Sequence, residues 1–229
     1  MYLSCHSYYS LRYGTLSVEK LADRAVAYGV ETLALTDINN STGIMDFVAV
    51  CKERKIKPVA GIEFRRDDRL LYTGLAANNE GFRELNEFLS HHNLRNLPLP
   101  DRPPEFENAF LVFPLQHLNS APSRQISITP SRHFIGLRPS DLNPILLSRH
   151  RDLLAHMVLM APVTFADEKE YELHRNFRAV DHNVLLSRLE KDQVAAPDEL
   201  MLPVEELRAI CHDFPQIMKN SEKLADSCS

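Results

Sequence analysis

The chain of 229 residues has few cysteines, no long hydrophobic run and no excess of basic residues. Its four cysteines (Cys5, Cys51, Cys211 and Cys228) show no C-x-x-C spacing, which argues against a disulfide framework or a zinc knuckle. No segment reaches the roughly 18 uncharged apolar residues that are needed to cross a bilayer. The N-terminus lacks the basic region and apolar stretch of a secretory signal. We therefore expect reduced thiols, no membrane partner and a cytoplasmic location.

The charge balance bears on nucleic-acid binding. The formal net charge is −5 and the sequence pI is about 6.1. A domain that grips DNA by itself is more often basic, with a pI above roughly 9, because phosphate contacts dominate its affinity. We therefore expect contact with DNA only through other parts of a larger protein.

Apolar segments of strand type alternate along the chain with segments of helical periodicity. This alternation is typical of βαβ units and a parallel sheet, and the number of strands favours a distorted βα barrel over an open sheet. We expect a single α/β domain that covers residues 1–229. The predicted strands are residues 32–36, 56–60, 71–76, 110–113, 134–137 and 156–161.

Later segments predict a long helix, two short ones and two loops. The long helix runs from about Lys169 to Leu189, and two short helices cover residues 204–211 and 217–225. Residues 93–107, which are rich in proline, and residues 116–132 are predicted to be extended surface loops. The apolar side chains expected on the inner side of the long helix are Leu173, Phe177, Val180, Val184 and Leu185.

Four motifs carry a family resemblance. They are LSCHSYYSLRYG (residues 3–14), LALTDINN (residues 33–40), KPVAGIE (residues 57–63) and ANNEGF (residues 77–82). The first three resemble the opening motifs of the PHP (polymerase and histidinol phosphatase) family. The fourth is similar to the polymerase branch, which is the N-terminal domain of bacterial DNA polymerase III alpha subunits. The resemblance implies a distorted, TIM-barrel-like βα barrel of the metal-dependent phosphoesterase type.

The resemblance also implies a site in which histidines and carboxylates at the ends of several strands bind divalent metals that activate water. At the positions that align with such ligands, only His6 and Glu63 keep ligand chemistry, with Asp37 as a polar neighbour. His174 matches a further family histidine. We expect His6, Asp37 and Glu63 to face one cleft, which Ile38, Leu71 and Thr164 line. The positions where the ligand is erased are Ser4, Tyr13, Ile38, Leu71, Pro162 and Thr164.

Two remaining ligands cannot organise a cluster of several metals. We therefore expect no catalytic residues and at most one weakly bound Zn²⁺, Mn²⁺ or Mg²⁺ ion. The resemblance implies a structural and docking domain that acts in DNA replication within a polymerase alpha subunit. Its partners would be the remaining domains of that subunit and a separate proofreading exonuclease.

Two other functions stay open at this stage. One is an active metal-dependent phosphoesterase, either a 3′–5′ exonuclease or a phosphate-monoester hydrolase. The other is a free-standing interaction protein, against which the motif at residues 77–82 argues. Local alternatives also remain. His6 is also consistent with a hydrogen-bonded structural histidine. Residues 65–69 form a mixed charge run that predicts a solvated turn. The alternative for this run is contact of Arg65 and Arg66 with a phosphate backbone.

Overall fold

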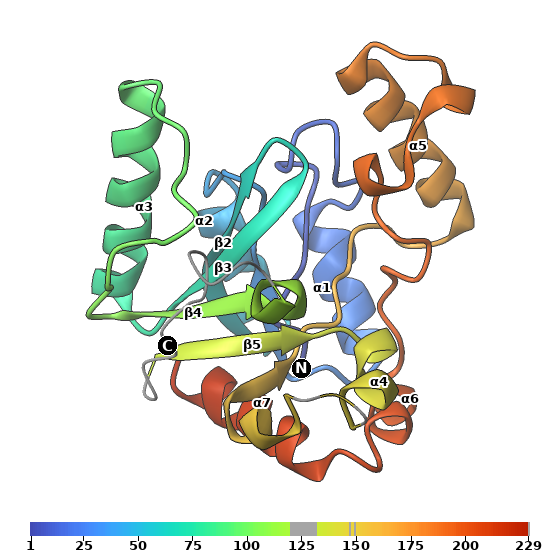
Figure 1. Cartoon of the computed structure of the whole chain (residues 1–229). Helices are drawn as coiled ribbons and strands as arrows, with labels where there is room; N and C mark the ends of the chain where they lie inside the picture. The colour runs from blue at the N-terminus through green and yellow to red at the C-terminus, as the bar shows by residue number, and fades with distance from the viewer. Residues whose placement is uncertain (120–131, 147, 149, 229) are drawn as a thin grey trace.

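Six strands form one curved sheet in which neighbours along the chain are also neighbours in space (Figure 1). The computed structural model describes residues 1–119, 132–146, 148 and 150–228. The predicted α/β class is confirmed, because helices alternate with most of the strands. The strands are β1 Thr32–Leu35, β2 Lys57–Arg66, β3 Arg69–Ala76, β4 Ala109–Pro114, β5 His133–Leu137 and β6 Met157–Leu159.

The predicted parallel arrangement holds at both sides of the sheet but is wrong in its middle. β1 pairs with β2, and β4, β5 and β6 pair with one another, in parallel. β3 is antiparallel to both β2 and β4. The reason is the short turn at Asp67 and Asp68, where Asp67 adopts a left-handed φ of 54°. A parallel crossover needs a dozen or more residues, so this turn permits only a hairpin.

The N-terminal segment joins the two edges of the sheet. The amide of Tyr2 donates to the carbonyl of Thr32 in β1 at 3.0 Å. On the other side, the amide of His6 donates to the carbonyl of Val163, which follows β6, at 2.8 Å. Cys5 and Val163 form an isolated parallel bridge. The sheet therefore closes through a short, irregular segment, which confirms the predicted distorted barrel.

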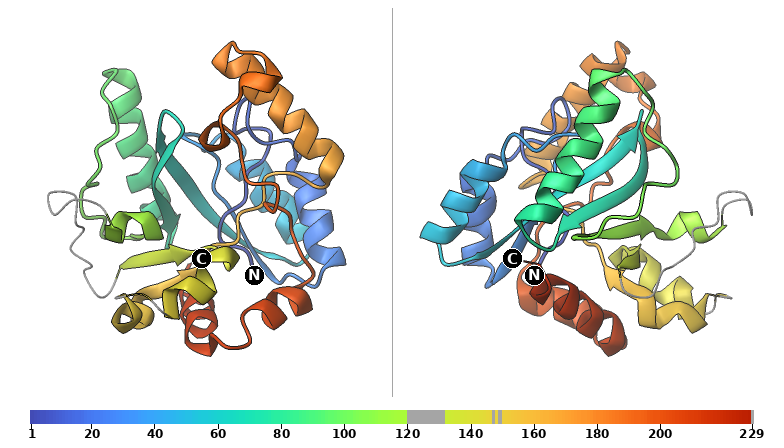
Figure 2. Two further views of the ribbon diagram at one scale, coloured as in Figure 1. Left: turned by 45° about the vertical axis from the view of Figure 1, so that its right-hand side comes forward. Right: turned by 90° about the vertical axis from the view of Figure 1, so that its left-hand side faces the viewer.

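Helices cover the outside of this sheet. The α1 helix packs on α2, α2 on β2, α3 on β3 and α7 on β6. The α7 helix lies at the opposite end of the molecule from α5 (Figure 2). The helices are α1 Val18–Ala27, α2 Ile44–Glu53, α3 Asn79–Leu94, α4 Leu142–Leu146, α5 Glu168–His182, α6 Val204–Ile210 and α7 Pro215–Asp226. The described 3-10 turns are η1 Leu115–Asn119, η3 Pro139–Asp141, η4 Arg151–His156, η5 Leu186–Arg188 and η6 Lys191–Gln193.

The motif at residues 77–82 has a local structural reason. The side chain of Asn78 caps α3 by accepting a hydrogen bond from the amide of Gly81 at 3.0 Å. A Cβ atom at Gly81 would lie 1.9 Å from the carbonyl oxygen of Asn108, so only glycine allows this approach. The helix continues through His91 and His92 to Leu94.

The predicted inner side of the long helix is wrong. Leu173, Val180 and Leu185 are 42%, 72% and 73% exposed, Val184 is also exposed, and Phe177 is half-buried. The α5 helix instead buries His174, Arg178 and Ala179. It also ends earlier, because Asn183 adopts a left-handed φ of 52°. The apolar side of α5 faces solvent, and its buried side carries polar groups into the site described below.

The remaining expectations have mixed outcomes. Of the loop predicted at residues 93–107, residues 95–107 form no helix or strand, whereas 93 and 94 belong to α3. Of the loop predicted at residues 116–132, residues 120–131 lie outside the described part, and 116–119 belong to η1. All four cysteines are free and buried, and Cys5 and Cys51 lie in the main hydrophobic cluster. Among the described helices, none is both long and apolar enough to cross a membrane.

Candidate functional site

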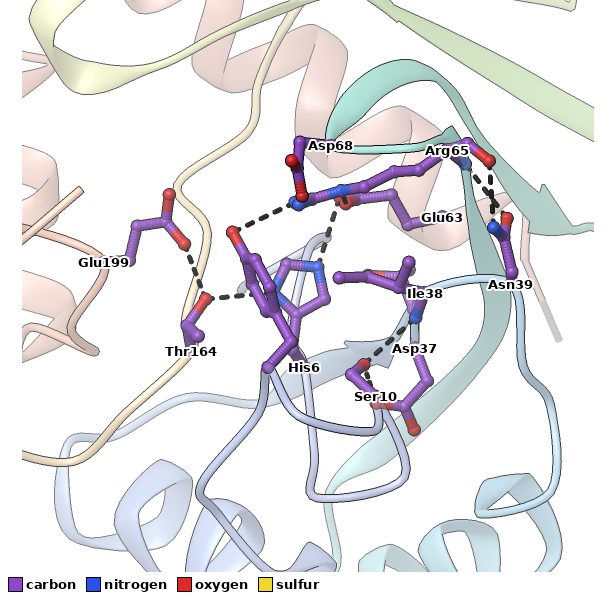
Figure 3. Close-up of polar contacts among 12 residues, drawn as sticks. His6, Ser10, Asp37, Ile38, Asn39, Glu63, Arg65, Asp68, Thr164 and Glu199 are labelled. Atoms are coloured by element: carbon purple, nitrogen blue, oxygen red, sulfur yellow. Dashed lines mark hydrogen bonds and ion pairs between the residues drawn. The ribbon is translucent and has the colours of Figure 1, made fainter. Parts of the chain in front are cut away.

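Two of the predicted site residues, His6 and Glu63, meet in a buried position at the end of the barrel that carries the β2–β3 turn (Figure 3). Glu63 lies in β2 just beyond the end of β1, where its amide donates to the carbonyl of Asp37 at 3.2 Å. Nε2 of His6 lies 3.2 Å from Oε2 of Glu63. The two residues are only 1% and 2% exposed, so water screens this contact poorly.

Arg65 provides the positive charge for Glu63. Its Nε donates to Oε1 of Glu63 at 2.5 Å, and its Nη2 donates to the Tyr13 hydroxyl at 3.2 Å. Glu63 and Arg65 are two residues apart on one strand, which places both side chains on the same face. Burial alone would raise the pKa of Glu63, but the charge of Arg65 and the contact with His6 outweigh it and lower the pKa to about 2. Glu63 is therefore ionised and paired.

The predicted solvated turn at residues 65–69 is wrong for Arg65, whose side chain is only 12% exposed. The two other arginines of this run bind Asp101 instead. Nη2 of Arg66 donates to Asp101 at 2.8 Å, and Arg69 pairs with the same carboxylate. The strand alternation explains the difference, because Arg65 follows the face of Glu63 while Arg66 points to the other side.

Thr164 connects His6 to a second buried carboxylate. Nδ1 of His6 lies 3.0 Å from the Thr164 hydroxyl, which donates to Oε2 of Glu199 at 2.5 Å. A hydroxyl has a single proton, so Thr164 accepts from Nδ1–H of His6. Arg138 in turn donates to Oε1 of Glu199 at 2.7 Å. Nε2 of His6 faces Glu63 but is not aligned for a hydrogen bond, and no other described atom partners it.

Tyr13 fills the centre of the site, at a position where the family resemblance implies an acidic ligand. Its ring meets the rings of His6 and His174 edge-on, with centroids 5.5 Å and 4.7 Å away. The guanidinium carbons of Arg65 and Arg178 lie 4.4 Å and 5.4 Å from the centroid of the same ring. Burial raises the pKa of the phenol, so it stays neutral. An aromatic ring and two cations thus occupy this part of the site.

His174 has a structural role in this arrangement. One ring nitrogen, Nδ1, lies 2.7 Å from the carbonyl oxygen of Tyr13, to which it donates. The other, Nε2, accepts from the amide of Ala195 at 2.8 Å. Burial lowers the pKa of His174 to about 4, so the ring is neutral at pH 7. Both nitrogens are in use, and His174 is not available as a metal ligand in this state.

Asp37 holds the loop that follows His6. It is 1% exposed and accepts hydrogen bonds from the amide of Ser7 at 2.7 Å, the hydroxyl of Ser7 at 2.8 Å and the hydroxyl of Ser10 at 2.6 Å. Burial raises the pKa of Asp37, and the serine donors oppose that shift. Among the described residues, the side-chain hydrogen bonds of Asp37 all go to this loop. The structure therefore brings His6 and Glu63 together, whereas the Asp37 carboxylate binds Ser7 and Ser10 (Figure 3).

The positions of erased ligands divide into four groups. Tyr13 and Ile38 line a cavity of about 400 Å³ together with Arg65. Thr164 contacts His6 directly. Leu71 is fully buried in the hydrophobic core and is not part of the cavity wall, unlike the expectation that it lines the cleft. The last two, Ser4 and Pro162, lie where the N-terminal segment pairs with the segment after β6.

Sequence reasoning missed several residues of this network. Arg178 is 6% exposed, donates to the carbonyl of Gln193 at 2.7 Å and to Asp181 at 2.6 Å, and pairs with Asp68. Its position four residues after His174 on α5 was the available signal, since residues so spaced share a helix face. Glu199 lies in an irregular segment, and no sequence pattern marks it. Arg65 was marked only as part of the mixed charge run at residues 65–69, and its spacing of two residues from Glu63 was the available signal.

The residues present do not fit a metal cluster. Within the described ranges, no group of three or more His, Cys, Asp or Glu side chains is arranged to hold a metal ion. The one carboxylate that contacts His6 is already paired with the Arg65 guanidinium. A binuclear or trinuclear site needs more anionic and imidazole ligands than this arrangement offers.

Comparisons with known proteins agree with the motifs. The DNA polymerase III subunit alpha of Escherichia coli K12 is 26% identical over 264 aligned residues, which cover 100% of this chain and 23% of that protein. The corresponding subunit of Chlamydia muridarum is 46% identical over 61 residues, or 27% of this chain and 5% of that protein. The chain thus spans about a quarter of the length of the E. coli relative.

An amidohydrolase structure from Chromobacterium violaceum covers 89% of this chain and 88% of its own, with 13% identity. Its TM-score of 0.35 is too low to define a shared fold. The PHP domain family matches residues 3–119, which is just over half of the chain and includes the first three motifs, the motif at residues 77–82, His6 and Glu63. The chain therefore belongs to the PHP domain family.

Proposed function

We propose that this chain is the PHP domain of a replicative DNA polymerase III alpha subunit and that it acts there as a non-catalytic structural domain. Similarity to alpha subunits over the whole chain supports the first part. The capped and closely packed motif at residues 77–82 is consistent with the same branch of the family. Reading the parent gene beyond residue 229 tests this assignment, because a polymerase palm domain is expected there.

One observation carries the non-catalytic part, namely that Glu63 is bound by Arg65 at 2.5 Å in a site with almost no exposure. Hydrolysis by a PHP centre depends on metals that lower the pKa of a bound water and stabilise charge on the phosphate. A guanidinium that pairs with the carboxylate already compensates the negative charge on which metal binding depends. Tyr13 also fills the space between Arg65 and His174.

The structural role follows from where the paired residues lie in the sequence. Arg178 of α5 joins the β2–β3 turn through Asp68 and the segment before Glu199 through Gln193. Arg138, after β5, joins the same segment through Glu199. The network thus ties together parts of the chain that are far apart in sequence. We propose that this rigid end supports the remaining domains of the alpha subunit and a separate proofreading exonuclease.

An assay of phosphoesterase activity tests this function. We expect the purified chain to show no Mn²⁺- or Zn²⁺-dependent cleavage of single-stranded DNA or nitrophenyl phosphate above a His6→Ala/Glu63→Ala double variant. The variant is the matched control, because trace nucleases contaminate such preparations and are unaffected by it. Metal-dependent turnover that disappears in the double variant would establish the alternative, an active exonuclease or phosphate-monoester hydrolase, and would refute the structural role.

A further inference from the structure

The contact between Arg65 and Glu63 has a second consequence, which rests on the proposed non-catalytic function. We propose that Arg65 is a built-in cation that replaces a divalent metal ion as the counter-charge of Glu63 and closes this site to such ions. Nε of Arg65 lies 2.5 Å from Oε1 of Glu63, with side chains 12% and 3% exposed. A guanidinium stays charged at any pH at which the protein is folded, so this counter-charge is permanent.

Both the side chain and the backbone of Arg65 are held in position beside Glu63 by further contacts. Its Nη2 donates to the Tyr13 hydroxyl at 3.2 Å, and its planar group lies over the Tyr13 ring at 4.4 Å. The backbone of Arg65 is fixed as well, since its amide donates to Oδ1 of Asn39 at 3.0 Å and its carbonyl accepts from Nδ2 of Asn39 at 2.9 Å. A positive charge held so close to Glu63 repels a second cation from the same carboxylate.

The geometry of the other ligand indicates that Arg65 is what closes the site. Nε2 of His6 is buried, has no hydrogen bond among the described residues, and lies 3.2 Å from Oε2 of Glu63. Two ligand atoms at this separation, each about 2.1 Å from one ion, subtend an angle of about 100° at that ion, which metal sites commonly adopt. His6 and Glu63 are therefore spaced as a chelating pair. The guanidinium of Arg65 supplies the positive charge that a bound ion would otherwise supply.

Three variants test this proposal. Arg65→Ala removes the built-in cation, and Arg65→Ala/Glu63→Gln removes the carboxylate as well. Arg66→Ala is the matched control, because Arg66 is the next residue on β2 but donates to the Leu99 carbonyl and to Asp101 on the other face. The thermal midpoint and isothermal titration calorimetry are measured for each chain with Co²⁺ and with Mn²⁺. Neither measurement depends on catalytic activity.

We expect the midpoints of the native chain and of Arg66→Ala to be unchanged by either ion. Arg65→Ala should have a lower midpoint without metal and should gain about 5 to 10 °C when the ion is present at ~100 times its Kd. The double variant should lose this gain, which assigns the bound ion to Glu63 and not to a cysteine. If Arg65→Ala does not fold, Arg65→Gln, which keeps a donor but no charge, is tested in the same way.

Two results would overturn the proposal. One is saturable binding of either ion to the native chain that Glu63→Gln abolishes. The other is a folded Arg65→Ala or Arg65→Gln chain that shows no metal-dependent shift. Either result leaves the proposed function standing if the phosphoesterase assay is negative, so failure of this inference and failure of that function are distinguishable.

Discussion

The neutral state of His174 makes the stability of this chain depend on pH in a defined way. Burial lowers the pKa of His174 from its ordinary value of about 6.5 to about 4 in the folded chain. The unfolded chain therefore binds a proton near pH 6.5 that the folded chain excludes until about pH 4. Stability from this group is fully present above pH 6.5 and is lost as the pH falls from 6.5 to 4. The shift corresponds to about 3 kcal/mol in total.

Substitution by glutamine isolates this effect. Its amide also has one donor and one acceptor for the Tyr13 carbonyl and the Ala195 amide, but it does not titrate. We expect His174→Gln to cost about 1 kcal/mol at pH 7, because the two hydrogen bonds lengthen. Between pH 7 and pH 5, the native chain should lose about 2 kcal/mol more stability than the variant.

Urea unfolding at pH 7, 6 and 5 measures the difference. This range avoids the titration of Glu63. Because the pKa of Glu63 is lowered to about 2, its contribution to stability is lost only as the pH falls from 4.5 to 2. The substitution changes no other histidine, so the comparison isolates His174. Equal pH dependence of the two chains would refute the assignment of His174 as a neutral, buried hydrogen-bonding group.

Three further substitutions follow from the packing. Arg65→Met should lower the free energy of unfolding by about 3–5 kcal/mol in urea titrations, because it leaves the Glu63 carboxylate buried and unpaired. The double variant Arg65→Met/Glu63→Gln should lower it clearly less, and additive costs of the two substitutions would contradict the pairing. Gly81→Ala should cost about 2 kcal/mol or more in the same assay despite the better helix propensity of alanine, because the added Cβ meets the Asn108 carbonyl; a stabilised variant would refute that contact. Val180→Lys should change stability by less than about 0.5 kcal/mol, since Val180 is 72% exposed, and a loss above ~2 kcal/mol would mean that this face of α5 is buried.

Much of the fold could be predicted because its signals are local. The strands of the sheet follow apolar runs that are bounded by turns. The N-cap residues Ser17 and Asn78 mark where α1 and α3 begin. The direction of β3 was predicted wrongly because apolar runs carry no information on strand direction. The two-residue turn at Asp67 and Asp68 was the signal that decides it.

The inner side of α5 could not be predicted from hydrophobic periodicity. That rule assumes that a helix buries its apolar side, and α5 buries His174 and Arg178 instead. Burial of such groups is favourable only when each polar atom has a partner, and those partners are Tyr13, Gln193 and Asp68. Tyr13 and Asp68 lie far from α5 in the sequence, and Gln193 follows it in an irregular segment. The polar side of the helix was therefore assigned to solvent, and its apolar side to the core.

The arrangement of charges explains how the site can be stable without a metal cluster. Each strongly buried carboxylate that faces the site has its own guanidinium, since Glu63 pairs with Arg65 and Glu199 with Arg138. Removing one partner from such a pair costs more than removing both, because the remaining charge is buried and unpaired. Replacing a metal centre therefore requires that arginines accompany the carboxylates that remain. Under the proposed function, the Glu63–Arg65 and Glu199–Arg138 pairs, and not only the lost ligands, account for a site that is stable without metal.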